Sequence, residues 1–330
     1  MSVAGAGDRE IIELTIVVPP ECAGWRLDHF LKRRIGRLSR TRIQGIIADQ
    51  IFLADGRTAR PALAVRAGET ILLRRPAPNE PEVPRHFEIL YEDDRVMVID
   101  KPAGLPMHTT AKFWRNTLVA LLRERYPDEQ MEIAHRIDRE TSGVLLIARD
   151  REAASFLTRA FARRDVDKTY LALVKGHPPD RGRIEQPLML LDTPSHVMMG
   201  PAGDAPGGLP AATAFEVIRR LPAHALCLAH PETGRQHQIR VHFSALGHPI
   251  VGDKLYGAGE ALFMRSCDEG VTPALLAAFD GLPRHALHAH RLTFPHPASR
   301  RPVTVESPWP PDLAAHVETL TRPSPEPEKC

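Results

Sequence analysis

Apolar residues recur at helical spacing near the start of the chain. Those between 27 and 35 repeat every three or four positions, which predicts a short amphipathic helix. Ser39 is a favoured N-cap residue, and the isoleucines at 43, 46 and 47 place one apolar face on a second short helix. Short strand-like runs follow at 51–53 and 70–73.

After residue 85 the apolar pattern changes to runs that are typical of strands. Strands are predicted near 95–100, 144–148, 168–174, 214–219 and 225–229, and helices near 117–125 and 152–163. Runs of strands dominate over helices in this part. The pattern predicts the α+β class, with a largely antiparallel mixed sheet and flanking helices.

Prolines separate the two patterns. Residues 76–84 hold four prolines, which favours a stiff extended connector. We therefore expect an N-terminal extension at 1–23, a small α/β domain at 24–75, a Pro-rich linker at 76–86, a large domain at 87–320 and a disordered tail at 321–330.

Composition limits the class of protein. The chain has 330 residues with 43% apolar content, which suits two domains, and no apolar run is long enough to cross a bilayer. Its four cysteines are scattered, and no signal segment begins the chain, so the cytoplasm is the expected compartment. We expect no membrane partner.

Charge is unevenly distributed. The net charge is only +2, yet residues 26–75 hold twelve Lys or Arg against four Asp or Glu. Arg40 and Arg42 lie on the polar face of the second predicted helix. This local excess of positive charge predicts contacts with phosphates, although basic helix faces are also common as plain solvated surfaces.

One short motif carries candidate chemistry. Residues 135–143 read His-Arg-Ile-Asp-Arg-Glu-Thr-Ser-Gly, so that Asp138 stands between Arg136 and Arg139 and before a predicted tight turn. Flanking cations favour an ionised carboxylate, and the turn would hold it rigidly, as a charged nucleophile requires. The plain alternative is a solvated surface aspartate.

The same motif resembles the signature of the RluA-type pseudouridine synthases. Ile137 stands where leucine is common in that family. Further blocks resemble the family in the same order along the chain, and together they cover about residues 85 to 300. They are Ile89 to His108, where Asp100 replaces the usual asparagine, Asp167 to Val174, Pro231 to Gly257, and the closing strand from Leu287 to Pro297.

The resemblance implies roles for particular residues. Asp138 would be the catalytic carboxylate, Tyr170 would lie against the target base, and Arg240 would pair with Asp138. Arg136 would fill the space that the target base leaves in the RNA stack. The remaining implied substrate-binding residues are His135, Arg235, Gln238 and Leu287. The family fold implies a bent sheet with the active-site cleft across its middle.

The basic N-terminal segment resembles, more loosely, a small RNA-binding domain first seen in a ribosomal small-subunit protein. It would bind RNA through residues such as Arg40 and Arg42. Large-subunit ribosomal RNA is the preferred substrate because this appended domain is commoner among enzymes that modify it, and transfer RNA is the alternative. The resemblance implies no cofactor, no metal and no DNA partner, and we expect a monomer.

Other interpretations fit some of these residues. Without the resemblance, Tyr170 reads as a strand aromatic in the core, and Arg240 falls on a helix face that is solvated by default. His285, His288 and His290, with His237 and His242 nearby in sequence, suggest a metal site, but no correctly spaced carboxylates or cysteines complete it. Histidines bonded within a polar core explain them more simply.

Two other functions stay open at this point. A non-catalytic RNA-binding protein could use the same scaffold, although Asp138, Tyr170 and Arg240 are all present. A glycosidic hydrolase usually needs two cooperating carboxylates, and Glu140 is the only nearby candidate. For the isomerase, the carboxylate has three possible routes: attack on the anomeric carbon, removal of a ribose proton, or addition to the uracil ring.

Overall fold

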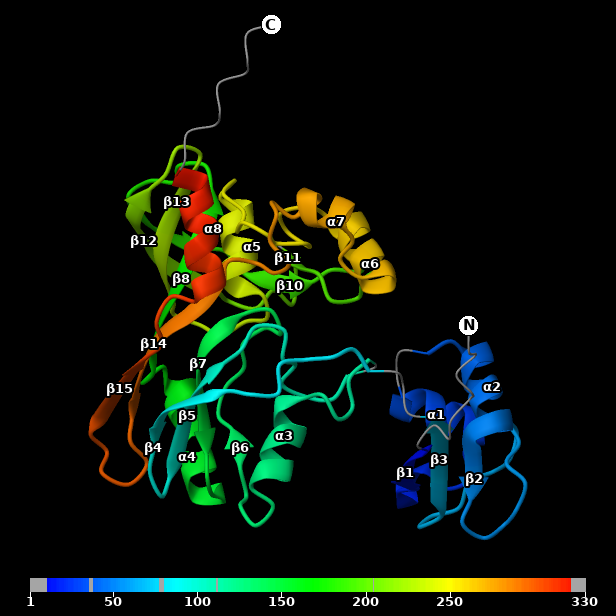
Figure 1. The fold of residues 1–330 in the computed structure, drawn as a ribbon. Coiled ribbons are helices and arrows are strands. Elements are labelled where there is room, and N and C mark those ends of the chain that lie inside the picture. The colour runs from blue at the N-terminus through cyan, green and yellow to red at the C-terminus, as the bar shows by residue number, and fades with distance from the viewer. Residues whose placement is uncertain (1–10, 36–37, 77–79, 111, 204, 322–330) are drawn as a thin grey trace, which may run out of the picture. The chain divides into compact units, whose positions relative to one another are not determined.

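The computed structural model describes residues 11–35, 38–76, 80–110, 112–203 and 205–321. The chain divides into two compact units, Met1–Glu80 and Pro81–Cys330. Both combine helices with sheets (Figure 1), so the predicted α+β class is confirmed.

The smaller unit is a three-stranded antiparallel sheet with two helices. The strands are β1 (Ile11–Val17), β2 (Ile51–Leu53) and β3 (Thr70–Pro76), in the order β1-β3-β2. The helices are α1 (Leu27–Ile35) and α2 (Arg40–Gln50), and a short 3-10 turn, η1, spans Pro20–Cys22. Ser39 caps α2 by accepting a hydrogen bond from the backbone N–H of Arg42.

The expectation of an extension at residues 1–23 is wrong for its second half. All seven residues of β1 pair with β3, and Ile12, Val18 and Cys22 are buried. The pattern missed this strand because its exposed face carries the apolar Ile11 and Val17 as well as polar residues, which blurs the alternation. Residues 1–10 lie outside the described part.

The predicted linker at 76–86 is shorter than expected. Strand β3 continues to Pro76, and residues 77–79 lie outside the described part. From Pro81 onward the chain belongs to the larger unit: the Pro81 carbonyl accepts a hydrogen bond from the Asn116 side chain, and Val83 packs against the core.

The larger unit is built on a ten-stranded mixed sheet, whose main path runs β4-β5-β7-β14-β8-β13-β12-β9, with β15 on β14 and β6 on β7. Its strands are β4 (Glu88–Glu92), β5 (Val96–Lys101), β6 (Glu132–Ile133), β7 (Ser142–Ala148), β8 (Asp167–Lys175), β9 (Arg181–Glu185), β12 (Ala212–Arg220), β13 (His224–Pro231), β14 (Leu287–Pro295) and β15 (Pro302–Glu306). A separate pair joins β10 (Leu188–Leu190) to β11 (Met199–Pro201).

A short parallel contact joins the two halves of this sheet. Strands β7 and β14 run parallel, with Ser142 and Gly143 opposite His288 and Ala289, whereas the other named pairs are antiparallel. Gly143 has φ 111°, and a Cβ placed there would lie 2.1 Å from the carbonyl oxygen of Ala289. Only glycine allows the strands to approach this closely.

Helices cover both faces of the sheet. They are α3 (Leu118–Arg125), α4 (Arg151–Arg163), α5 (Gln238–Ala245), α6 (Glu260–Glu269), α7 (Pro273–Ala278) and α8 (Pro311–Thr321). In β5, Met97 and Ile99 join the core that includes α3, α5 and α8, whereas Val96 and Val98 join the core beneath α4. Such a strand is buried on both faces, which explains its continuous apolar sequence.

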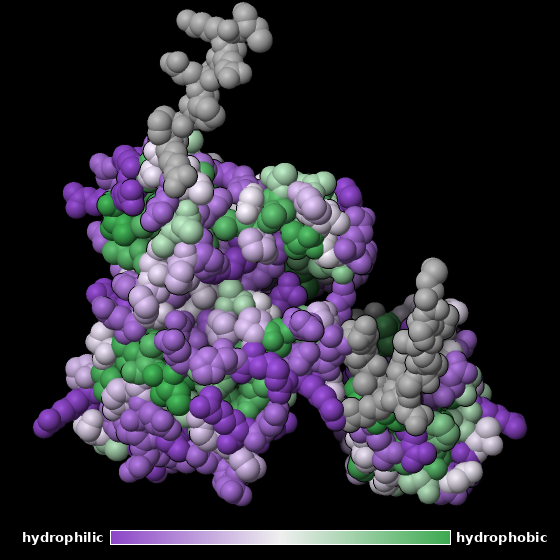
Figure 2. All heavy atoms as spheres, in the orientation of Figure 1, coloured by the Kyte–Doolittle hydropathy of each residue, from purple (hydrophilic) through white to green (hydrophobic). Residues whose placement is uncertain are grey.

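The predicted strands and helices of this unit all occur, with ends that differ by at most a few residues. The predicted tail begins where α8 ends at Thr321, and residues 322–330 lie outside the described part. Hydrophilic residues cover most of the face drawn in Figure 2. Among the described residues, no helix is both long and apolar enough to span a membrane.

Candidate active site

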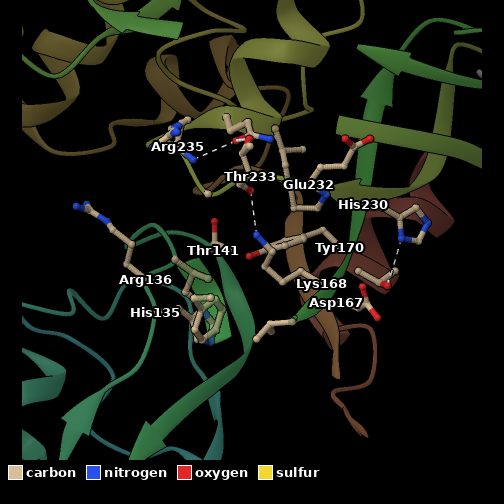
Figure 3. Close-up of a pocket in the computed structure, with 18 of the residues that line it drawn as sticks. His135, Arg136, Thr141, Asp167, Lys168, Tyr170, His230, Glu232, Thr233 and Arg235 are labelled. Atoms are coloured by element: carbon tan, nitrogen blue, oxygen red, sulfur yellow. Dashed lines mark hydrogen bonds between the residues drawn. The ribbon is translucent and has the colours of Figure 1, made fainter. Parts of the chain in front are cut away.

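A cleft of about 1040 Å³ lies in the larger unit, where β8, the turn before β7 and the segment before α5 meet. Figure 3 shows Arg136 and Thr141 on one side, Tyr170 and Lys168 extending from β8, and Thr233 and Arg235 on the facing segment. All the site residues predicted in this unit line the cleft: His135, Arg136, Asp138, Tyr170, Arg235, Gln238, Arg240 and Leu287.

A hydrogen-bonded turn holds Asp138 at the cleft. The Thr141 N–H donates to the Asp138 carbonyl at 3.1 Å, which closes a turn over residues 138–141. The turn was predicted at Thr-Ser-Gly, but Ser142 and Gly143 already belong to β7. The next carbonyl, that of Arg139, accepts from the Gly104 N–H at 2.8 Å and from the Lys101 ammonium at 3.1 Å. Lys101 is fully buried, so the turn is tied to the interior rather than to the surface.

Arg240 bridges Asp138 to a second carboxylate. Its Nη1 donates to Asp138 Oδ2 at 2.8 Å, while its Nε and Nη2 donate to the two Asp253 oxygens at 2.7 and 2.9 Å. Asp253 Oδ1 also accepts from the backbone N–H groups of Leu255 and Tyr256. A bidentate pair of this kind fixes the plane of the guanidinium and aims its free edge at Asp138.

These charges keep Asp138 ionised. Burial alone would raise the pKa of Asp138, but His237, Arg240 and His285, together with the hydrogen bond from Arg240, hold it well below its usual value. Burial lowers the pKa of His237 and of His285 to about 4, so Arg240 is the cation that persists at neutral pH.

The flanking arginines make their contacts elsewhere. Arg139 pairs with Glu140 at 3.2 Å and lies over the Phe113 ring, and Arg136 is exposed. The cation in direct contact with Asp138 is therefore not a flanking arginine but Arg240, in the pairing that the resemblance implied.

Tyr170 is more buried than a half-buried strand position, with 8% of its surface exposed. Its ring lines the cleft from β8. Burial, and after it the nearby Asp138 charge, raises the pKa of Tyr170 far above its usual value. The phenol therefore stays protonated at any physiological pH and offers a flat aromatic face with a polar end.

Gln238 lines the cleft, but its amide groups are used within the protein. Its Oε1 accepts from the Thr233 hydroxyl and the Arg235 N–H, and its Nε2 donates to the Ala212 carbonyl and the Thr213 hydroxyl. With every amide contact made internally, Gln238 holds the segment before α5 in place. The structure argues against the direct substrate contact that was expected.

The remaining predicted substrate-binding residues differ in how far their side chains are occupied by contacts within the protein. His135 accepts a hydrogen bond from the Leu146 N–H at 3.1 Å through Nε2, and Leu287 is buried at the start of β14. Arg235 donates to the Pro210 carbonyl. Arg136, at the cleft edge, makes no side-chain hydrogen bond or ion pair with the residues that the structure describes.

Three residues that the sequence analysis did not single out also surround Asp138. They are His237, Asp253 and Tyr256. Tyr256 donates or accepts a 2.8 Å hydrogen bond with His237 Nδ1, and Arg240 lies over its ring at 5.0 Å. All three stand within the block 231–257 that resembles the family, which was the only sequence signal for Asp253 and Tyr256, whereas His237 was also considered with the histidine cluster.

The histidines considered as metal ligands bond within the core instead. His285 bonds to the Thr141 hydroxyl at 2.8 Å, and His288 to the Ser142 hydroxyl at 2.9 Å. Both therefore support the turn that carries Asp138. Within the described ranges, no group of three or more His, Cys, Asp or Glu side chains is arranged to hold a metal ion.

Glu140, the second carboxylate that a hydrolase would need, forms an ion pair within the protein. It pairs with Lys254, and His285 Nδ1 lies 3.8 Å from it. Burial would raise the pKa of Glu140, but the charges of Lys254, His285 and Arg139, with the hydrogen bond from Lys254, together lower it. An ionised, paired carboxylate is a poor general acid, which counts against the two-carboxylate hydrolase.

In the small unit, the two predicted RNA-binding arginines differ in their contacts, because only one of them pairs with a carboxylate. Arg40 donates to the buried Asp28 at 3.3 Å, as does Arg26 at 2.9 Å, whereas the side chain of Arg42 makes no hydrogen bond or ion pair with the described residues. Asp28 thus fixes two guanidinium groups at the surface of this unit.

Known proteins resemble the chain along most of its length. A model of the family described as RNA pseudouridylate synthase matches residues 95–245. A ribosomal large subunit pseudouridine synthase D of Xanthomonas campestris is 38% identical over 92% of this chain and 91% of its own length. The protein of the same name from Nitrosomonas europaea is 36% identical over 97% of this chain and 91% of its own length.

Solved structures agree with the sequence matches. Human RNA Pseudouridylate Synthase Domain Containing 1 aligns with a TM-score of 0.56 and 30% identity, covering 72% of this chain and 90% of that protein. Human RNA Pseudouridylate Synthase Domain Containing 4 aligns with a TM-score of 0.57 and 26% identity, covering 71% of this chain and 92% of that protein.

Proposed function

The chain belongs to the RNA pseudouridylate synthase family, and from that premise we propose that it isomerises uridines of large-subunit ribosomal RNA, with Asp138 as the catalytic carboxylate. The observation that carries the assignment of Asp138 is its place in the cleft as an ionised group, paired with the buried Arg240.

The reaction of the family sets what the site must do. The bond from the ribose to uracil nitrogen 1 breaks, the uracil turns, and carbon 5 bonds to the ribose instead. One hydrogen leaves carbon 5 and one arrives at nitrogen 1, so the product is an isomer and no group donor is consumed. A charged carboxylate beside the anomeric carbon serves each of the three routes considered above.

The other residues would position the target. Tyr170 would stack on the uracil, and the Asp253-bound Arg240 would keep Asp138 charged and oriented. A base inside folded RNA must leave its stack before it can reach such a cleft. Arg136 suits the filling of that vacancy because its side chain is exposed at the cleft edge and has no described partner.

The names of the relatives support large-subunit ribosomal RNA as the substrate. The basic small unit supports a long RNA with contacts beyond the target nucleotide, because Arg42 is exposed and Arg40, although paired with Asp28, keeps an exposed side chain that can meet phosphates.

Mapping pseudouridine across total RNA would test this proposal. Cells lacking the protein would be complemented with the intact chain, with Asp138→Asn, or with Asp128→Asn as an exposed control carboxylate. We expect sites in large-subunit ribosomal RNA to disappear and to return with the intact chain and the control only.

Other outcomes would count against parts of the proposal. Loss of sites only in transfer RNA would overturn the substrate assignment but keep the chemistry. Full restoration by Asp138→Asn would overturn the catalytic role, and no lost site in any RNA would favour a binding protein.

A further inference from the structure

His237 faces Asp138 across a narrow gap. Its Nε2 lies 4.0 Å from Asp138 Oδ1, and the two side chains are 12% and 18% exposed. That distance is too long for a direct hydrogen bond. It is short enough for one small polar group to bond to both atoms, as happens when a water or a substrate oxygen lies between two partners.

The backbone and Tyr256 aim His237 at this gap. His237 has φ 56° and ψ 14°, in the left-handed region that a non-glycine residue adopts at a cost. It stands at the N-cap position of α5, yet its side chain makes no capping hydrogen bond. Nδ1 bonds instead to the Tyr256 hydroxyl at 2.8 Å, which fixes the direction of Nε2.

The neighbours of Tyr256 decide which imidazole nitrogen carries the hydrogen. The Met199 N–H donates to the Tyr256 hydroxyl oxygen at 3.0 Å, which fills one acceptor position and leaves the phenol proton available for His237. The phenol donates to His237 Nδ1 at 2.8 Å in the tautomer that carries the ring hydrogen on Nε2, and the Asp138 carboxylate 4.0 Å from Nε2 favours that tautomer. Burial lowers the pKa of His237 to about 4, so the ring is neutral at physiological pH.

The gap therefore has a donor on one side and an acceptor on the other. Asp138 Oδ1 only accepts, because Asp138 is ionised and its Oδ2 is occupied by Arg240. A bridging group must donate to Asp138 and accept from His237. Uracil carbonyls only accept and the uracil N–H only donates, whereas a hydroxyl does both. A water also does both, but among the groups of the target nucleotide the 3′ and 5′ oxygens are esterified within an RNA strand, which leaves the 2′-hydroxyl.

We propose that His237 is a further catalytic residue, which binds the 2′-hydroxyl of the target nucleotide together with Asp138 and so selects ribose over deoxyribose at the reacting position. This inference rests on the proposed function. The 2′-hydroxyl is attached next to the anomeric carbon, so holding it fixes the carbon that Asp138 must reach. Tyr256 acts as a positioning residue because it orients His237.

The test is a double-mutant cycle, in which one change is made at His237 and the other removes the 2′-hydroxyl of the substrate. Single-turnover rates would be measured on an RNA carrying either uridine or 2′-deoxyuridine at the target position, with wild type, His237→Gly and His237→Gln. Glycine accepts the left-handed backbone without strain, and glutamine returns a donor near the position of Nε2. For each protein preparation, the rate on uridine is divided by the rate on 2′-deoxyuridine. An inactive fraction of the protein lowers both rates equally and does not change this ratio.

We expect the deoxy substitution to slow wild type by at least about tenfold, since it removes a hydrogen bond to a charged carboxylate as well as one to His237. In His237→Gly that penalty should shrink by about threefold to tenfold, and His237→Gln should restore part of it. Equal penalties in wild type and His237→Gly would overturn the inference, even if the glycine variant were slow on both substrates.

The two proposals fail in different ways. If wild type converts uridine in an Asp138-dependent manner and shows no coupling to His237, only the present inference is wrong. If wild type converts no uridine in any RNA tested, the proposed function is wrong and this inference falls with it.

Discussion

Arg240 lies buried between the carboxylates of Asp138 and Asp253, and it is the group that sets the charge of Asp138. Replacing it in Arg240→Met removes a cation 2.8 Å from Asp138 while burial remains. The pKa of Asp138 should then rise, because burial favours the neutral acid. We expect the acid limb of kcat/KM against pH to move upward and the maximal rate to fall by at least about a hundredfold.

The exposed Arg219 provides a matched control, since Arg219→Met removes the same charge away from the cleft. Its pH profile should coincide with that of wild type. An Arg240→Met enzyme that kept the wild-type acid limb would contradict the assignment of Arg240 as the counter-ion of Asp138.

At the residue scale, the sequence pointed to Asp138, Tyr170 and Arg240 as site residues, and only the resemblance pointed to the pairing of Arg240 with Asp138. Spacing along the chain placed Asp138 beside Arg136 and Arg139, whereas its actual partner is 102 positions away in sequence. Contacts over such separations leave no local periodic signal. For the same reason, the support that Asp253 gives to Arg240 became visible only in the structure.

At the element scale, the site depends on the parallel contact between β7 and β14. The turn that carries Asp138 leads directly into β7, and Gly143 lies against the Ala289 backbone. In Gly143→Ala the new Cβ would lie 2.1 Å from the Ala289 carbonyl oxygen, so the strands must separate or the turn must shift. We expect a loss of about 3 kcal/mol or more in the free energy of unfolding, measured by urea titration.

Gly247→Ala is the matched control for this effect. Gly247 also has a positive φ, of 86°, but a Cβ there would meet nothing within 4 Å. Its cost should be limited to backbone strain, about 1 kcal/mol. Equal losses in the two variants would mean that backbone conformation, and not the close approach of the strands, makes Gly143 necessary.

The elements themselves were largely predictable from the sequence. Helix α4 and strands β5, β7 and β8 have strong apolar patterns, and each lies within a few residues of its predicted range. Strand β1 was missed because its apolar residues occupy both faces. The strand order could not be predicted, since the pairing of β14 with both β7 and β8 joins segments far apart in the chain.

At the scale of the whole molecule, buried neutral histidines should make the protein sensitive to mild acid. Burial lowers the pKa of His285 and of His288 to about 4, against about 6.5 in an unfolded chain. Below pH 6.5 these histidines bind protons in the unfolded chain but stay neutral in the folded chain. The free energy of unfolding therefore decreases as the pH drops from about 6.5 to 4. Each histidine should contribute on the order of 1–3 kcal/mol to this loss.

Thermal melting across this pH range would check the prediction. A His288→Asn variant should have a lower melting temperature at neutral pH, because it gives up the bond to Ser142, but a shallower decline toward pH 4. A decline as steep as that of wild type would show that the histidine is not the group being titrated.

The small unit should contribute RNA affinity without contributing to the chemical step. A double variant, Arg40→Gln with Arg42→Gln, removes two exposed charges from α2. Binding should weaken, and the slope of log affinity against log salt should decrease in magnitude by about 1 to 2, because fewer counterions are released. The single-turnover rate at saturating RNA should stay unchanged.

The exposed Arg123 and Arg219 of the larger unit lie outside the cleft and allow a control with the same change in net charge. If the double variant of these two residues altered the salt slope as much as the α2 variant, the effect would be one of net charge and not of a specific RNA-binding surface.

The central claim is that Asp138 performs the isomerisation within the cleft. The most direct test is a single-turnover measurement of pseudouridine formation by purified protein on unmodified large-subunit ribosomal RNA, comparing wild type with Asp138→Asn. We predict that wild type converts a specific uridine, whereas Asp138→Asn binds the RNA with similar affinity and forms no pseudouridine. Conversion by the asparagine variant at a rate near that of wild type would contradict the account.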